Sequence, residues 1–281
     1  MTPARLLAMF EVLDRPAKKL GETVRSVIKP GPLKNALSGS WLGHALHPLL
    51  TDVTIGSFTS AVALDWLGGD DSEPAAQRLI GLGLLSAVPT VSSGYSDWAD
   101  TEVADDAVRR IGIVHAAGNF TSASLFAASW LARRRGDHGR GRALALAAGS
   151  VLGGAAYLGG HMTLAEGVGV DHTTFEGGTQ DWTPVLDNAE LADGQLRCVE
   201  ADGTAVMVAR SGDGLYALSN HCSHRGGPLH EGTLDAGAVT CPWHDSVFDV
   251  RDGALIHGPA AYPQPAWDTR VRNGRIEVRR R

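Results

Sequence analysis

The 281-residue sequence has few cysteines, no excess of basic charge and no recognisable export signal. Its three cysteines are too few for a disulfide framework. Two of them lie in Cys–His motifs described below, and the third, Cys198, is expected to be a small buried strand residue. The net charge of −6 at pH 7 gives no reason to expect a nucleic-acid partner. The N-terminus lacks an apolar core followed by a small-residue cleavage site, so we expect no secretory signal.

The sequence also lacks an overall apolar excess, since its mean hydropathy is −0.06. Four segments are nevertheless apolar for about 20 residues, long enough to cross a hydrocarbon core of about 30 Å. They are rich in Gly, Ala, Ser and Thr, which let membrane helices approach closely. They predict a four-helix transmembrane domain over residues 41–166, after an amphipathic helical segment over 1–40. The four segments are residues 46–67, 78–97, 109–132 and 142–165.

A soluble helical bundle is the alternative, because Asp52, Asp65 and Asn119 interrupt the apolar segments. The polar connections, termini and C-terminal region lower the average hydropathy, however, and we favour a multi-pass protein of the cell membrane. An even number of spans puts the N-terminus and the C-terminal domain on one side, which we expect to be the cytoplasm. The basic segment 15–34 agrees with this orientation, whereas the basic loop 133–142 opposes it.

Four histidines fall near the same end of these segments, because successive spans run in opposite directions. Ionisable groups at membrane depth usually face the bundle interior and often have a function. Neutral imidazoles on facing helices can hold haem iron, so a b-type haem or a quinone site is one hypothesis. The other is that they only form hydrogen bonds between helices or at helix ends. The four residues are His44, His47, His115 and His161.

Three sequence stretches characterise this region. They are GHALHPLLTDVTIGSFTSAVALDW, whose His-x-x-His-Pro motif begins the first span, and the later SSGYSDW and GGHM. Over residues 40–170 they resemble a family of uncharacterised four-helix bacterial membrane proteins. The resemblance implies a multi-pass membrane domain and no established activity, so the haem hypothesis comes from the histidine spacing alone.

Beyond a linker over residues 167–178, short strand-like runs alternate with turn residues, which predicts a small all-β domain over 179–281. Two of its loops contain Cys-x-His and Cys-x-x-His motifs, at residues 222–224 and 241–244. Zinc sites favour Cys-x-x-Cys and His-x₃₋₅-His spacing, which these loops lack. A [2Fe–2S] centre with two thiolates on one iron and two imidazoles on the other takes one ligand of each kind from each loop. The spacing therefore favours an iron–sulfur centre over zinc.

The motif CSHRGGPL…CPWHDSVFDV closely resembles the Rieske iron–sulfur family, and the resemblance runs over residues 180–281. It implies that Cys222 and Cys241 bind one iron of a [2Fe–2S] cluster through sulfur. It also implies that His224 and His244 bind the other iron. A proline-rich loop near the end of the sequence resembles the loop that covers the cluster in this family.

Several loop residues are expected to tune such a cluster. Gly226, Gly227 and Pro228 suit a tight loop whose backbone N–H groups approach the cluster sulfurs. Ser246 stands where family members place a serine that bonds to cluster sulfur, but Phe248 replaces their tyrosine. The loop disulfide of quinol-oxidising members is also absent. Since donors to sulfur stabilise the reduced cluster, the loss of one donor predicts a lower reduction potential than in those members.

A Rieske oxygenase would need a further mononuclear iron, held by two histidines and a carboxylate. Too few residues follow His244 to form that domain, and we expect no oxygen-activating site. We therefore expect an electron-transfer or oxidoreductase component.

Three functions fit the sequence. The favoured one is a membrane-anchored Rieske protein that passes electrons between a haem or quinone in the bundle and the cluster. In the alternative, the bundle is only an anchor, and the Rieske domain serves as a ferredoxin-like carrier for a separate reductase or oxygenase. The third is a redox sensor in which the state of the cluster alters the bundle. The expected partners are redox donor and acceptor proteins or a quinone, together with the membrane.

Overall fold

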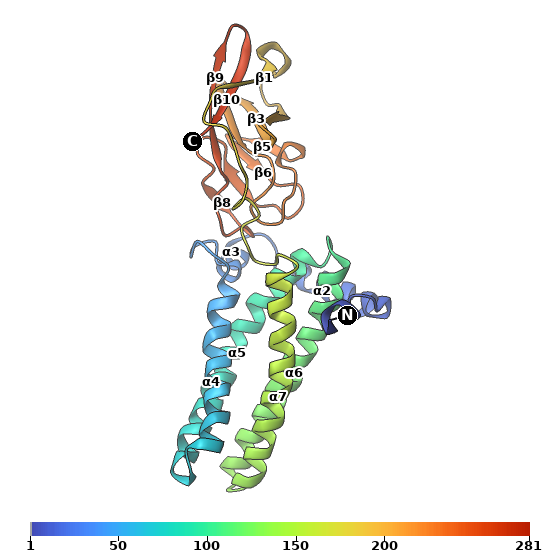
Figure 1. Ribbon diagram of the computed structural model, residues 1–281, viewed down its shortest axis with the longest axis vertical. Coiled ribbons are helices and arrows are strands. Elements are labelled where there is room, and N and C mark those ends of the chain that lie inside the picture. Colours follow the sequence, from blue (N-terminus) through green and yellow to red (C-terminus); the bar gives the residue numbers. More distant parts are fainter. Residues whose placement is uncertain (1) are drawn as a thin grey trace. The chain divides into compact units, whose positions relative to one another are not determined.

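The computed structural model describes residues 2–281, apart from the side chain of Asp70 (Figure 1). Within these residues the chain forms seven α-helices followed by ten strands. It folds into two compact units. Residues up to 28, together with 46–168, make a helical unit, while residues 29–45 and 169–281 make a unit that contains all the strands.

Four long helices form the helical unit, and they overlap the four apolar segments of the sequence. Short connections make successive helices antiparallel, and α4 contacts α7 as well as α5, which closes the bundle (Figure 1). The helices are α4 (Leu46–Leu67), α5 (Glu73–Thr101), α6 (Asp106–Arg134) and α7 (His138–Leu164).

Among the described residues, three helices are long and apolar enough to cross a membrane, namely α5, α6 and α7. We expected four such spans, and α4 is the one that differs. Its 22 residues include the carboxylates of Asp52 and Asp65 and the ring of His47, which lower its hydropathy. The structure therefore has three candidate spans and a shorter fourth helix packed with them.

Aromatic and small side chains fill the core of the bundle. The rings of Phe58 and Phe126 stack with their centroids 3.9 Å apart and their planes 1° from parallel. Gly83 lies against Phe58, where a Cβ atom would come within 2.5 Å of the ring. Ala61 and Ala148 are completely buried nearby. Small residues at these contacts allow the close helix packing that is common in membrane proteins.

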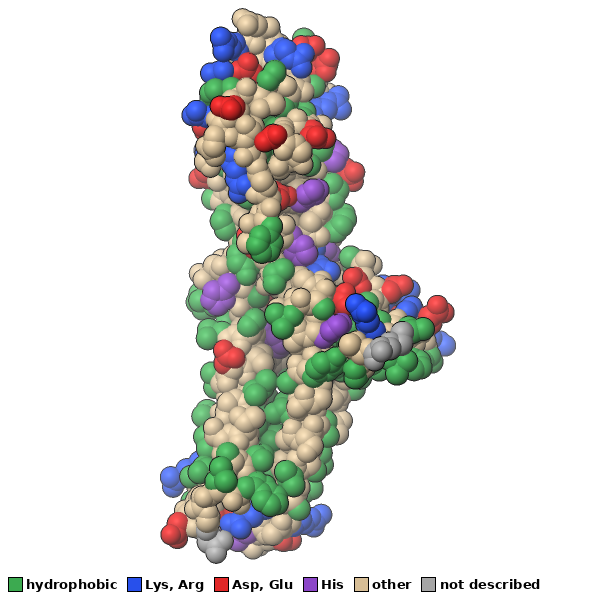
Figure 2. All heavy atoms as spheres, in the orientation of Figure 1, with side chains coloured by type: hydrophobic (Ala, Val, Ile, Leu, Met, Phe, Trp, Pro, Cys, Tyr) green, Lys and Arg blue, Asp and Glu red, His purple; other side chains and the backbone are tan. Residues whose placement is uncertain are grey.

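The outward surface of the bundle is largely apolar. Leu85, Val88 and Phe120 have 75%, 68% and 76% of their surface exposed. Figure 2 shows hydrophobic side chains along the length of the helices, while charged side chains gather toward the helix ends. Soluble proteins rarely expose apolar surface of this extent, so the surface is suited to contact with lipid.

A cluster of buried ion pairs marks one end of the bundle. The side chain of Arg133, near the end of α6, is fully buried and lies 2.6 Å from Asp65 of α4 and 2.7 Å from Glu73 of α5. Gly141 of α7 makes room for it, because a Cβ atom there would come within 2.6 Å of the Arg133 side chain. All four long helices therefore meet at this cluster.

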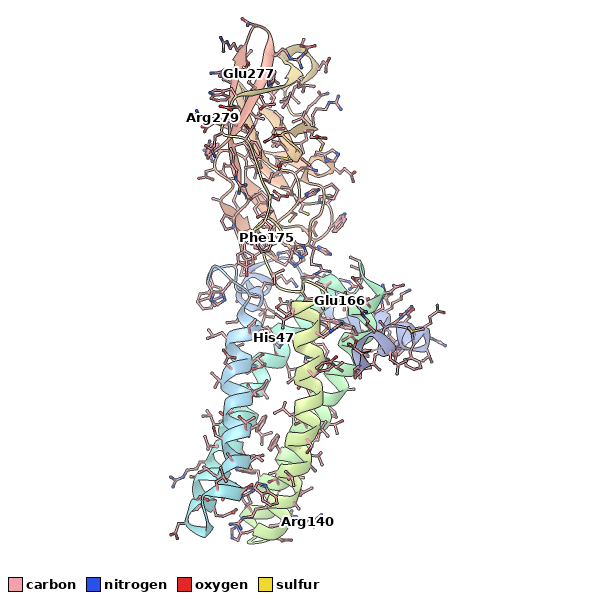
Figure 3. The ribbon with its side chains drawn as sticks, in the orientation of Figure 1. His47, Arg140, Glu166, Phe175, Glu277 and Arg279 are labelled. Carbon is pink, nitrogen blue, oxygen red and sulfur yellow. The ribbon has the colours of Figure 1, made fainter. Side chains whose placement is uncertain are left out.

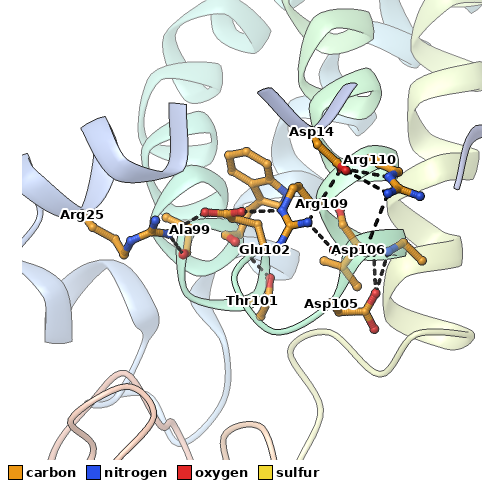
Figure 4. A network of polar contacts seen from close by, with 12 residues as sticks. Asp14, Arg25, Ala99, Thr101, Glu102, Asp105, Asp106, Arg109 and Arg110 are labelled. Atoms are coloured by element: carbon orange, nitrogen blue, oxygen red, sulfur yellow. Dashed lines mark hydrogen bonds and ion pairs between the residues drawn. The ribbon is translucent and has the colours of Figure 1, made fainter. Parts of the chain in front are cut away.

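A second polar network lies where α5 connects to α6 (Figure 4). The side chain of Glu102 is 1% exposed and lies 2.9 Å from Arg109 of α6. It also lies 2.7 Å from Arg25 of α2 (Asp14–Val27), and Arg110 pairs with Asp14 of the same helix at 2.8 Å. These ion pairs fix α2 to the bundle.

The two networks are separated along α6 by a distance that suits a bilayer. Arg133 follows Arg109 by 24 residues, which corresponds to about 36 Å of α-helix. The hydrocarbon core of a membrane is about 30 Å thick. The buried charges are therefore placed where both ends of the helix would leave the hydrocarbon.

The N-terminal segment is divided between the two units. We expected one helical segment over 1–40, whereas the structure has α1 (Pro3–Leu7) and α2 in the helical unit and then a break. Residues 29–45, with α3 (Pro32–Ser38), belong to the unit with the strands. The break coincides with a Pro-Gly-Pro sequence, in which proline interrupts helix hydrogen bonding and Gly31 has a φ of 148°.

The second unit contains two antiparallel sheets. One has six strands in the order β1-β10-β9-β4-β3-β2, and the other has four in the order β5-β6-β7-β8. Met207, Leu218 and Phe248 are fully buried in a core shared by the two sheets. The strands are β1 (Thr183–Asp187), β2 (Leu196–Ala201), β3 (Thr204–Ser211), β4 (Gly214–Ser219), β5 (Thr233–Asp235), β6 (Ala238–Thr240), β7 (Val247–Asp249), β8 (Leu255–His257), β9 (Ala266–Arg272) and β10 (Arg275–Arg280).

Cys198 lies on β2 and is exposed, so the expectation that it would be buried was wrong. The strand assignment itself is correct. β2 is the last strand of the six-stranded sheet, and within that sheet it pairs only with β3. A strand pattern in the sequence does not distinguish an edge strand from a central one, and an edge side chain has fewer neighbours to cover it.

Most of the expected linker over residues 167–178 packs on the unit with the strands. The backbone N–H of His172 donates to the carbonyl of Ser223 at 3.0 Å, and Thr173 is 3% exposed. Arg280 donates to two backbone carbonyls of the segment. In contrast, Phe175, labelled in Figure 3, is 98% exposed. Hydrogen bonds to its backbone, from the Arg280 side chain and with Ser223, thus hold this segment in place.

Candidate metal centre

The first Cys–His motif lies in a tight loop that follows β4. The backbone N–H of Cys222 donates to the carbonyl of Gly227 at 2.8 Å, and its carbonyl accepts from the N–H of Gly226 at 2.7 Å. Gly226 has a φ of 73°, a backbone conformation that glycine adopts without steric cost. The backbone therefore closes around the cysteine.

The second motif lies in an equivalent loop between β6 and β7. The backbone N–H of Cys241 donates to the carbonyl of Ser246 at 2.8 Å, and its carbonyl accepts from the N–H of Asp245 at 3.2 Å. Asp245 has a φ of 61° at the position that Gly226 occupies in the first loop. The two loops thus repeat one backbone arrangement around their cysteines.

These loops bring the two thiols together and the two imidazoles together. Cys222 and Cys241 are each 1% exposed, and a hydrogen bond joins their side chains. The rings of His224 and His244 have centroids 5.0 Å apart and planes at 89°. No group of three His, Cys, Asp or Glu side chains among the described residues is placed to hold a single metal ion. The four side chains thus form a pair of thiols and a pair of imidazoles, and each loop supplies one thiol and one imidazole.

The hydrogen bond between the thiols controls their protonation. Donation from Cys222 lowers the pKa of Cys241 to about 7, and the backbone N–H groups of Trp243 and His244 act in the same direction. The same bond, together with burial, raises the pKa of Cys222 well above its ordinary value. Negative charge on sulfur is therefore favoured at Cys241, and a thiolate is the form that binds iron.

His224 has a buried Nδ1 atom without a hydrogen-bond partner. Such atoms are rare in native proteins, and an unpaired one calls for an explanation such as an ion. Burial, followed by the positive charges of His244, Lys34 and Arg225, lowers the pKa of His224 well below its ordinary value. The imidazole is therefore neutral near pH 7, which is the form that binds metals.

Gly227 and Pro228 complete the first loop close to the second. A Cβ atom on Gly227 would come within 3.0 Å of both Cys241 Sγ and the Trp243 ring, so a larger residue would displace the sulfur or the indole. Pro228 forms an isolated antiparallel bridge with His221, on the other side of the motif. Gly227 thus lets the two loops approach closely, and Pro228 helps to close the first loop.

Ser246 connects the second loop to the proline-rich loop. It is fully buried, and its Oγ accepts a hydrogen bond from the backbone N–H of Ala260 at 2.9 Å. Because Oγ is the acceptor in this bond, its own O–H remains able to donate to another group. Phe248, at the position of the family's tyrosine, is buried in the core.

Gln264 supports the first loop and was not identified from the sequence. It is 2% exposed, and its Nε2 donates to the carbonyls of Ser219 at 2.8 Å and His221 at 2.6 Å. Its Oε1 accepts from the backbone N–H of Ser223 at 3.0 Å. All these partners are far from Gln264 in the sequence, so no local pattern could have revealed it.

Of the four histidines expected in the bundle, His44 precedes α4 and belongs to the unit with the strands, and both it and His161 have local partners. His44 is exposed, and its Nδ1 lies 3.0 Å from the carbonyl of Ala45. His161 lies 3.3 Å from Glu166, just beyond the end of α7. Hydrogen bonds and ion pairs near helix ends account for both positions.

The other two histidines, His47 and His115, each bond to a neighbouring helix of the bundle. His47, labelled in Figure 3, donates through Nδ1 to the carbonyl of Thr90 at 2.9 Å. His115 donates through Nδ1 to the carbonyl of Ala155 at 2.8 Å, and Asn119 lies 3.0 Å from its Nε2. Since a carbonyl only accepts, each Nε2 carries the lone pair.

The paired Cys–His loops on a two-sheet domain define an iron–sulfur β domain, which one chain joins to an apolar helical bundle. Residues 181–268 match the model of the Rieske [2Fe–2S] domain, and residues 43–172 match that of a predicted membrane protein family, DUF2231. The chain belongs to the Rieske [2Fe–2S] family. Both resemblances seen in the sequence are thereby confirmed.

Several relatives of the β domain are ferredoxins. The chain is 33% identical over 100 residues to ferredoxin CarAc of Metapseudomonas resinovorans, covering 35% of this chain and 94% of that protein. It is 32% identical to the anthranilate 1,2-dioxygenase ferredoxin subunit of Burkholderia cepacia, covering 35% of this chain and 91% of that protein. A solved structure, the ferredoxin of carbazole 1,9a-dioxygenase from Nocardioides aromaticivorans IC177, is 36% identical, with a TM-score of 0.35, and covers 36% of this chain and 98% of that one.

A Rieske domain implies a [2Fe–2S] cluster. The side chains present fit this group, because two buried thiols and two imidazoles converge from matched loops and His224 Nδ1 has no protein partner. Together with its ferredoxin relatives, this makes the domain an electron carrier of the ferredoxin type.

Proposed function

We propose that this chain is a membrane-anchored Rieske electron-transfer protein. Cys222 and Cys241 would bind one iron of the cluster, and His224 and His244 the other. The observation that carries the proposal is the repeated loop, which gives each ligand pair one member from each motif. A bound cluster supplies one-electron chemistry. The protein keeps the thiols dry, while both imidazoles are partly exposed and offer the route by which electrons leave.

The purified full-length protein tests this proposal directly. We expect about two iron and two labile sulfide per chain, and an electron paramagnetic resonance (EPR) signal of a Rieske cluster after reduction with dithionite. Zinc without iron in protein expressed with ample iron would contradict the proposal. So would an EPR signal typical of a cluster with four thiolate ligands.

We infer that α4 crosses the membrane with the three candidate spans, so that the bundle over 41–166 anchors the β domain over 179–281. The 22 residues of α4 extend about 33 Å. Asp65, near its end, pairs with Arg133 near the end of α6. Four spans would place the chain before α4 and the β domain on one side, which we propose is the cytoplasm.

Reporter tags at the two ends of the chain test this topology in intact cells. We expect both tags to be protected from external protease until the cells are permeabilised. A tag that is cleaved at one end only would mean an odd number of spans and would remove α4 from the membrane.

The ferredoxin relatives suggest the class of redox partner. One of them is named as the ferredoxin subunit of a dioxygenase. By this likeness, the β domain would exchange electrons with a separate reductase or oxygenase, while the bundle holds it at the membrane. Tethering would raise the effective concentration of the cluster near membrane-bound partners.

A second candidate function makes the bundle itself a redox site, with a haem or a quinone at the histidines. The favouring observation is that Nδ1 of His47 and of His115 bonds to a carbonyl, which leaves Nε2 as the possible ligand. The amide of Asn119 beside His115 Nε2 weighs against a metal there. Sharp Soret and α bands on reduction would support a haem, and their loss in His47→Ala would identify His47 as one of its ligands. Broad absorption that only bleaches would leave the bundle as an anchor or a quinone site.

The Ser246 hydroxyl is expected to raise the reduction potential of the cluster. Its Oγ already accepts from Ala260, so its O–H is available to donate toward sulfur. Ser246→Ala removes that donor and should lower the midpoint potential, because hydrogen bonds to sulfur stabilise the reduced cluster. An EPR-monitored redox titration measures the shift. Ser211→Ala, far from the loops at the end of β3, is the matched control and should leave the potential unchanged.

A further inference from the structure

Residues 29–45, which we call the α3 segment, fold with the β domain although they precede the first long helix. The match to the Rieske domain begins only at residue 181, and the ferredoxin CarAc is covered almost completely by 35% of this chain. The α3 segment is therefore an addition to the ferredoxin fold, contributed by the other end of the chain.

The α3 segment is hydrogen-bonded to the proline-rich loop. The backbone N–H of Gly258 donates to Asn35 Oδ1 at 2.9 Å, and Ser40 Oγ donates to the carbonyl of Ala260 at 2.9 Å. A Cβ atom on Gly258 would collide with Ser40, so the contact is close. Ala260 in turn donates its N–H to Ser246 of the second ligand loop. A continuous chain of hydrogen bonds thus joins the α3 segment to the candidate metal centre.

Lys34 is the charged residue on the buried face of this segment. It is only 5% exposed, and Ser38, one turn further along α3, is 3% exposed on the same face. Lysine is rarely buried to this degree. Its charge is close enough to act on the ring of His224, as are those of Arg225 and His172. Of these three, only Lys34 comes from outside the β domain and its adjoining linker.

We propose that the α3 segment is a built-in cover of the cluster, and that Lys34 raises the reduction potential through its positive charge. Reduction adds one negative charge at the centre, and a nearby cation stabilises that charge. The interaction is stronger at a buried position, where the effective dielectric constant is lower than in water. Asn35 and Ser40 position the lysine by fixing the segment to the loop. The inference rests on the proposed cluster site.

The experiment is an EPR-monitored redox titration of the full-length protein in detergent. Lys34→Met should lower the midpoint potential, while Lys34→Arg, which keeps the charge, should stay near the wild-type value. Lys29→Met is the matched control, because Lys29 belongs to the same segment but is exposed, and it should have no effect. Iron content and EPR spin count per chain show whether each variant holds its cluster.

A second variant removes the two hydrogen bonds that fix the α3 segment to the proline-rich loop and keeps the charge of Lys34. Asn35→Ala combined with Ser40→Ala should lower the potential in the same direction and should speed the loss of iron to a chelator. A full cluster with unchanged potential in both Lys34→Met and the double variant overturns the inference but leaves the proposed function intact. If Lys34→Met does not retain the cluster, the double variant decides alone. A wild-type protein without a Rieske signal would instead remove the proposed function itself.

Discussion

Replacing Cys222 with serine is expected to abolish the cluster and leave the helical bundle folded. Cys222 is buried beside Cys241, and each contributes the thiol of its loop to the pair. A serine hydroxyl does not ionise near neutral pH and is a far weaker ligand for iron than a thiolate. We expect at least a tenfold loss of iron, sulfide and EPR signal per chain, measured on the detergent-purified protein.

Cys198→Ser provides the matched control for this prediction. The residue is the third cysteine of the chain, and it lies exposed on the edge strand β2, away from both ligand loops. Its replacement should leave metal content and EPR signal unchanged. Equal iron content in Cys222→Ser and Cys198→Ser, with the signal of the parent protein, would show that Cys222 is not a ligand.

Replacing Arg133 with methionine is expected to destabilise the bundle strongly. The guanidinium is completely buried between Asp65, whose side chain is 1% exposed, and Glu73. Methionine keeps much of the volume but removes the cation that pairs with the buried carboxylate of Asp65, while Glu73 keeps His138 at 2.8 Å. Removing one member of a buried ion pair typically costs about 3–5 kcal/mol. Loss of helical circular dichroism with denaturant or heat, in detergent, measures the change in the free energy of unfolding.

Arg135→Met is the control, because Arg135 follows the same helix and is exposed. Exposed substitutions usually change stability by about 0.5 kcal/mol or less. Unfolding of Arg133→Met at the same denaturant concentration as the control would mean that water reaches the carboxylates. The helix ends would then be held by apolar packing alone.

The long helices were predictable because their signal is local. The long helices begin and end within five residues of the limits expected from the apolar segments. The status of α4 was less predictable. Its hydropathy falls short of the other three, and its membership of the bundle comes from its contacts with α5 and α7.

The candidate site was predictable to the extent that the motifs contain it. Two Cys–His motifs with unequal spacing indicate one thiol and one imidazole per loop. In the structure the two thiols lie together and the two imidazoles lie together. Gln264 could not be found in this way, because its three backbone partners are distant in sequence. The bundle histidines were expected to lie in one layer, and their individual partners emerged only from the helix contacts.

The sequence by itself determined the elements and the chemistry of this protein: apolar segments of membrane length, short strands, and two motifs that supply thiols and imidazoles. Only the tertiary structure decided which distant residues meet. It placed Arg133 between two carboxylates, exposed Cys198 at a sheet edge, and folded Lys34 onto the β domain rather than with the bundle. The reason is physical, since periodicity and ligand spacing act along the chain, whereas burial and ion pairing depend on neighbours that the chain brings together only when it folds.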